Sequence, residues 1–142
     1  VVEKFNCNTL DIAPTVEKIT GLEAESKRHG RPVSDYLDGT ETPDYAVFTS
    51  NGQQFGLFCS RMLRNVRYKY IWNLTDVDEF YDLETDPWEM DNRVDDEALA
   101  PVLAQMRRQL YEDLKAAGDP LARFWNARQL LEGKKLGPKD RK

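Results

Sequence analysis

The stretch EFYDLETDPWEMDNRV, residues 79–94, joins two parts of the sequence that have different hydrophobic periods. Alternating side chains over residues 79–83 indicate a short strand, and the pair Asp86-Pro87 then favours a turn. The pattern beyond Val94 is helical. Clustered carboxylates can act as general acid and base or bind Ca²⁺, but this stretch lacks the central Gly and ligand spacing of a calcium loop. We therefore interpret it as a junction between a strand and a helix.

Four β-rich segments end at this junction. They are YAVFTS (45–50), QFGLFCSRML (54–63), YKYIW (68–72) and EFYDL (79–83). Short turn-forming segments separate them, and short connections favour antiparallel pairing between strands that are neighbours in the sequence. The sequence therefore predicts a four-stranded antiparallel meander.

Apolar residues recur at helical spacing after the junction. The stripe ends before Gly118 and consists of Leu99, Leu103, Met106, Leu110, Leu114 and Ala117. This spacing predicts a long helix that begins close to residue 98, and a last helix is expected within residues 120–132, with Leu121, Phe124 and Trp125 packing back. One sheet packed against one long C-terminal helix is an α+β fold.

A separate helix is expected near the start of the chain. Asp11 is a candidate N-cap and Gly21 a candidate stop signal. Ile12, Val16 and Ile19 fall on one short apolar face of this helix.

The charges are unevenly distributed along the chain. A net charge of −5 argues against nucleic acid as a partner, and no apolar run approaches the roughly 18 residues of a membrane span. A basic run is followed by eleven acidic residues within positions 76–97. We expect cross-strand pairing between the two runs, with Arg61 as the exception that is available to an anion. The basic run contains Arg61, Arg64, Arg67 and Lys69.

The chain shows no recognisable catalytic or metal-binding motif. GxSxG, HExxH and phosphate-binding glycine loops are absent from the sequence, and His29 is the only histidine. Cys7 and Cys59 lack CxxC spacing and are expected to be buried thiols, although their pairing stays open. The segment SNGQQFG (50–56) has two interpretations: a tight Asn51-Gly52 turn, or a loop that presents polar amides to a ligand.

The order of four motifs resembles the C-terminal part of the type I sulfatases of the alkaline phosphatase superfamily. The resemblance covers about residues 9–118, and its last motif is the most specific. Pro32, Phe80 and Trp88 stand where that family more often has Ser, Leu and Gly. The motifs are LDIAPTVEKITG (10–21), HGRPVSDYLDG (29–39), RMLRNVRYKYIW (61–72) and EFYDLETDPWEMDN (79–92).

This resemblance implies a domain organisation. Residues 1–43 would be the end of the large α/β sulfatase domain together with a connection, so the first helix belongs to that domain. Residues 44–133 would form a C-terminal α+β subdomain, and residues 134–142 a basic disordered tail.

The resemblance also implies a parent enzyme that hydrolyses sulfate esters with a formylglycine and Ca²⁺. This chain contains neither C-x-P-x-R nor S-x-P-x-R, so we expect no catalytic residue, metal ligand or cofactor in it and no activity when it is alone. Its expected partners are an upstream catalytic domain of the same protein and the parent's substrate, a sulfated small molecule or glycan. The expected substrate contacts are Asn51, Gln53, Gln54 and Arg61.

Two other hypotheses stay open at this point. The chain could be the same region of a phosphodiester or phosphonate monoester hydrolase of the superfamily, or an independent α+β interaction domain without an enzyme. If a large domain normally covers the first helix, Ile12, Val16 and Ile19 are exposed in the isolated chain. Self-association is then expected.

Overall fold

The computed structural model divides into two compact units, Val1–Ala46 and Val47–Lys142. The boundary expected at residue 43 falls just before this division. The structure describes residues 9–22, 30–37, 44–52 and 58–135.

The first unit contains two helices, α1 (Ile12–Thr20) and α2 (Val33–Leu37), and a short 3₁₀ turn, η1 (Thr9–Asp11), before α1. Helix α1 ends as predicted at Gly21, whose φ of 73° is the left-handed conformation that glycine adopts without strain.

Asp11 is the N-cap residue of α1, as predicted, although its side chain makes no cap hydrogen bond to the helix. Its Oδ1 accepts a hydrogen bond from the backbone N–H of Arg31 at 2.9 Å. Thr15 Oγ1 likewise accepts from the N–H of Val33 at 2.8 Å. Both side chains are used to hold the α2 segment against α1, a contact that helix rules cannot reveal.

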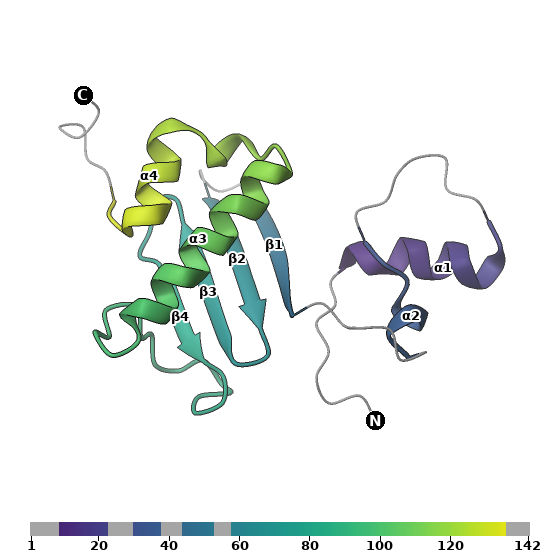
Figure 1. The fold of residues 1–142 in the computed structure, drawn as a ribbon, viewed down its shortest axis with the longest axis horizontal. Coiled ribbons are helices and arrows are strands. Elements are labelled where there is room, and N and C mark those ends of the chain that lie inside the picture. The colour runs from purple at the N-terminus through teal and green to yellow at the C-terminus, as the bar shows by residue number, and fades with distance from the viewer. Residues whose placement is uncertain (1–8, 23–29, 38–43, 53–57, 136–142) are drawn as a thin grey trace. The chain divides into compact units, whose positions relative to one another are not determined.

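The second unit is built on a sheet with strand order β1-β2-β3-β4 (Figure 1). This order confirms the predicted meander, and the pairings of β2 with β3 and of β3 with β4 are antiparallel. Asn51-Gly52 lies within β1 and therefore does not form the two-residue turn. The strands are β1 (Tyr45–Gly52), β2 (Phe58–Asn65), β3 (Tyr68–Asn73) and β4 (Glu79–Asp82).

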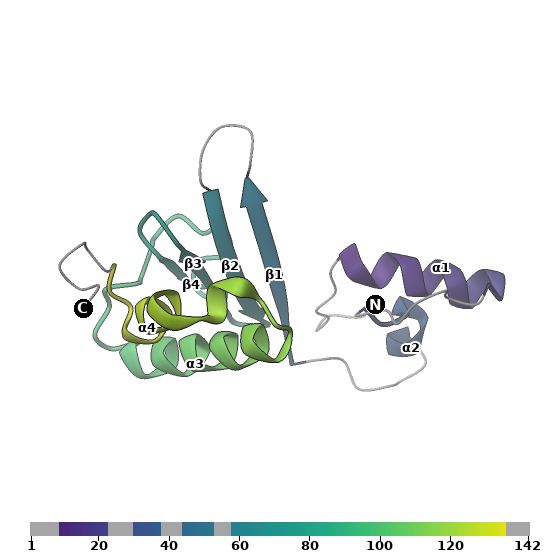
Figure 2. The same ribbon diagram turned by 90° about the horizontal axis from the view of Figure 1, so that it is seen from above.

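Helices α3 (Ala100–Ala116) and α4 (Phe124–Glu132) lie on the same face of this sheet (Figures 1 and 2). A short 3₁₀ turn, η2 (Pro120–Ala122), connects them. Helix α3 begins close to the predicted position. Trp125 of α4 does not pack back as expected, because it is 41% exposed, whereas Leu130 is fully buried.

The core lies between the sheet and the two helices. Tyr70 of β3 stands opposite Leu63 of β2 and Phe80 of β4, so one row of side chains crosses three strands toward the helices. The middle of the predicted stripe on α3 is buried, while its ends, Leu99 and Ala117, are not. The largest fully buried side chains are Trp72, Tyr70, Phe80, Leu110, Leu114 and Leu130.

The acidic stretch is a junction, as the turn chemistry predicted. Asn92 Oδ1 accepts from the backbone N–H of Phe80 at 2.9 Å, and its Nδ2 donates to the carbonyl of Asp78 at 3.0 Å. Asp86 Oδ2 accepts from the N–H of Asp91 at 2.9 Å. These bonds fasten the loop to β4 before α3 begins.

Two members of the basic run form ion pairs with the acidic run, but neither pair joins two strands, because Arg67 lies in the turn before β3 and Glu89 in the loop after β4. Arg67 Nη2 lies 2.8 Å from Asp82 Oδ2, and Lys69 Nζ lies 2.5 Å from Glu89 Oε2. The hydrogen bond from Arg67 holds the pKa of Asp82 below its usual range. Asp82 and Glu89 therefore have structural partners.

Candidate functional site

The best-defined polar site of the second unit lies at the end of β1, where the sequence predicted substrate contacts. Asn51 is exposed there. Gln53 and Gln54, the other amides of the prediction, lie outside the described residues.

Arg61 of β2 lies beneath this strand end and is only 3% exposed. Its position opposite Trp72 places it on the helix-facing side of the sheet. Its Nε donates to Asp119 Oδ2 at 2.8 Å, and its Nη2 donates to Oδ1 of the same carboxylate at 3.4 Å. Arg61 is therefore the predicted exception to cross-strand pairing with the acidic run, but its guanidinium already holds a carboxylate.

The remaining donor group of Arg61 faces the strand end. Nη1 donates to the Ser60 carbonyl at 2.8 Å, to Asn51 Oδ1 at 3.0 Å and to the Ser50 carbonyl at 3.3 Å. One guanidinium thus connects Asp119 to the last residues of β1. The Arg61 side chain is only 3% exposed and each of its three nitrogens donates to a protein group, so we interpret any contribution of Arg61 to ligand binding as passing through Asn51.

Sequence reasoning missed Asp119. It follows the helix-ending Gly118 and precedes Pro120, and its Oδ1 accepts from the N–H of Leu121 at 2.8 Å. The Asp-Pro pair could have marked it as the cap of a following turn. Its partner Arg61 is 58 residues away in sequence, and no local signal connects the two.

A second buried polar cluster surrounds Asp78, in the connection between β3 and β4. Asp78 is 5% exposed, and its Oδ2 accepts from the Tyr70 hydroxyl at 2.8 Å. Lys135 Nζ lies 2.6 Å from Oδ1, and Arg107 Nη2 lies 3.8 Å from Oδ2. Burial, followed by the Asp78 charge, holds the pKa of Tyr70 well above its usual value. Each polar group faces a partner, which is typical of a structural network.

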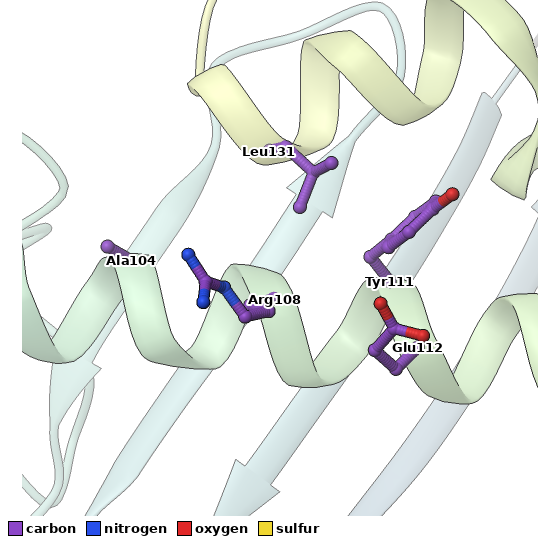
Figure 3. A pocket seen from close by; sticks show the side chains of 5 residues that line it. All are labelled: Ala104, Arg108, Tyr111, Glu112 and Leu131. Carbon is purple, nitrogen blue, oxygen red and sulfur yellow. The ribbon is translucent and has the colours of Figure 1, made fainter.

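A groove of about 400 Å³ lies on the outer surface of α3 and α4 (Figure 3). It combines one basic and one acidic side chain with an aromatic ring and contains no nucleophile with an adjacent base. Its lining residues are Ala104, Arg108, Tyr111, Glu112 and Leu131.

The described residues do not fit the metal that the resemblance implies for the parent enzyme. No group of three or more His, Cys, Asp or Glu side chains among them could hold a metal ion. Asp82 and Glu89 of the acidic run are instead paired with Arg67 and Lys69. Cys59 is a free, half-buried thiol, whereas Cys7 and His29 lie outside the described part of the chain. No described helix has the length and apolar character that crossing a membrane requires.

Known proteins are similar to this chain in sequence and fold. Residues 2–116 match the family model described as N-sulphoglucosamine sulphohydrolase, C-terminal. A 2-O GAG sulfatase is 27% identical, with a TM-score of 0.72 over 83% of this chain and 27% of that chain. A Bacteroides thetaiotaomicron protein described as a sulfatase is 28% identical, with a TM-score of 0.69 over 78% of this chain and 25% of its own.

The fold is not restricted to sulfatases. A phosphonate monoester hydrolase of Agrobacterium radiobacter has a TM-score of 0.60 at 24% identity, over 75% of this chain and 24% of that chain. The chain spans about a quarter of the length of these three solved proteins. With a family match across most of its residues, the chain belongs to the N-sulphoglucosamine sulphohydrolase C-terminal family, and its fold is that of the C-terminal part of sulfatases of the alkaline phosphatase superfamily.

Proposed function

We propose that this chain forms one wall of the substrate cleft in a sulfatase that hydrolyses a sulfated sugar, and that it is inactive without the upstream catalytic domain. The observation that carries this proposal is the family match over residues 2–116. The family description names a sulphoglucosamine hydrolase, and one structural neighbour acts on a sulfated glycosaminoglycan. The formylglycine and Ca²⁺ of such an enzyme would be supplied by the upstream domain.

The exposed end of β1 supplies the cleft wall in this proposal. Oδ1 of Asn51 accepts from Arg61, and we propose that the amide Nδ2 of this exposed side chain contacts the ligand. An amide N–H is a donor suited to hydroxyl or sulfate oxygens. Gln53 and Gln54 are proposed to extend the same contact.

The 142-residue chain, incubated with a chromogenic aryl sulfate and Ca²⁺, should give no turnover, whereas the complete enzyme should hydrolyse the sulfate ester. The reason is that the chain contains no formylglycine precursor motif. Release of the chromophore is the measurement. Turnover by the chain alone would refute its proposed inactivity.

The phosphonate monoester hydrolase neighbour supports an alternative, because its fold is the same. A complete enzyme that cleaves a phosphonate monoester and leaves the sulfate ester intact would favour that alternative. The upstream gene sequence gives an independent check: a C-x-P-x-R or S-x-P-x-R motif supports the sulfatase, and a different nucleophile supports the phosphoester hydrolase.

The apolar face of α1 is proposed to pack against the upstream domain. Ile12 is 60% exposed, Val16 is 51% exposed and Ile19 is 74% exposed. These exposures agree with the expectation from the sequence. Three large apolar side chains on one face of a helix form a patch of the type that mediates protein contacts.

The isolated chain should therefore self-associate, and replacing Ile12, Val16 and Ile19 by Ser should shift it toward monomer in sedimentation velocity experiments. The matched control replaces Trp88 and Met90 by Ser, because these side chains are also exposed, at 82% and 84%, but belong to the other unit. Association that persists in the α1 variant and disappears in the control would contradict the assignment to α1.

A further inference from the structure

We propose that Arg61 is a positioning residue, held by Asp119, that fixes Asn51 at the end of β1 for substrate binding. The inference rests on the proposed function, because it assigns a role within the same cleft wall. It also changes the role expected for Arg61 from the sequence, from gripping an anion itself to orienting the residue that contacts the substrate.

The burial of this ion pair is the first argument. The Arg61 side chain is 3% exposed and that of Asp119 is 10% exposed. Removing two charges from water is costly, and a buried pair commonly stabilises a fold no more than apolar side chains of the same volume would. What such a pair can add is a fixed orientation of the groups that it bonds, because a guanidinium is planar and holds its donors in a fixed fork.

The geometry of the fork is the second argument. Asp119 accepts from Nε and Nη2 and thereby sets the plane of the guanidinium, which leaves Nη1 aimed at Asn51 Oδ1 and the Ser50 carbonyl. Asp119 is itself fixed, because its backbone N–H donates to the Leu114 carbonyl at 2.8 Å. The position of Asp119 after α3 therefore fixes the orientation of Asn51 at the end of β1, because the planar guanidinium of Arg61 bonds both residues.

The third argument concerns the ligand. With one lone pair of its Oδ1 already taken by Arg61, Asn51 offers a ligand mainly the N–H donors of its amide. The site then favours oxygen-rich acceptors, such as the hydroxyl or sulfate oxygens of a sugar, over ligands that offer only donors.

Kinetics of the complete enzyme test this role. The Asn51→Ala variant removes the proposed contact, whereas the Arg61→Lys variant keeps a charge for Asp119 but loses the fork that reaches Asn51. Each variant should raise KM about tenfold with kcat unchanged, as expected for the loss of one hydrogen bond made equally in the ground and transition states. The double variant should be no worse than either single variant, because both act on one contact. The control is Arg67→Lys, because Arg67 lies in the turn before β3 and pairs with Asp82 rather than with the end of β1, and it should change neither constant.

The outcomes separate the two proposals. An unchanged KM in Asn51→Ala would remove this strand end from the cleft and refute the proposed contact. A raised KM in Asn51→Ala with an unchanged KM in Arg61→Lys would leave that contact standing and overturn the positioning role alone. If Arg61→Lys folds poorly, as judged by circular dichroism, Asp119→Asn replaces it, since this variant keeps the side-chain shape and removes the charge that orients the guanidinium. An unchanged KM in that variant also overturns the positioning role.

Discussion

The Leu110→Ala variant should lose about 3 kcal/mol of unfolding free energy, within the range typical of large-to-small substitutions in a core. Leu110 is fully buried on α3, between the similarly buried Met106 and Leu114 of the same face. The substitution removes apolar surface burial and leaves a cavity between α3 and the sheet. Alanine is the best helix former, so the loss cannot be attributed to helix propensity.

Urea unfolding followed by tryptophan fluorescence measures this effect, because Trp72 is completely buried in the same core. The matched control is Leu131→Ala on α4, whose side chain is 41% exposed and should lose less than about 1 kcal/mol. Equal losses of unfolding free energy in the two variants would show that Leu110 of α3 is not packed in the core as described.

The fold was predictable where the pattern is local and periodic. Alternation identified the four strands, and the spacing of Leu103, Met106, Leu110 and Leu114 identified the face of α3 that meets the sheet. The predictions failed where contacts with residues distant in the sequence determine which side chains are buried. Trp125 looks like a core residue in the sequence, but Leu130 takes that place in the structure.

The candidate site shows the same limit more sharply. The sequence analysis expected Arg61 to be the exception to pairing in the basic run, but charge patterns do not specify partners. The strand register determines that Arg61 points toward the helices, and the end of α3 determines that Asp119 meets it there. Both are properties of the assembled fold. The sequence therefore singled out Arg61 but could not indicate that Asp119 is its partner.

Asp78→Asn should produce the other large effect, a loss of about 3 kcal/mol of unfolding free energy, as is typical when one partner of a buried charge network is removed. The substitution keeps the shape of the side chain and an acceptor for the backbone N–H of Asn73, which lies 3.1 Å from Oδ1. It removes the negative charge that Arg107 and Lys135 face. The Tyr70 hydroxyl, which is buried, also exchanges a charged acceptor for a neutral group.

Asp76→Asn is the matched control, because it changes the same charge in the same loop. Asp76 is exposed, and its Oδ1 accepts from the N–H of its neighbour Val77. A change within about 0.5 kcal/mol is expected there, measured by the same urea titration. If Asp78→Asn were as mild as this control, Arg107 and Lys135 would have to reach solvent without the carboxylate. Lys135 is 37% exposed and could do so, but Arg107 is 15% exposed. The large loss should therefore come mainly from Arg107 and Tyr70, and Lys135→Met alone should reproduce only a minor part of it.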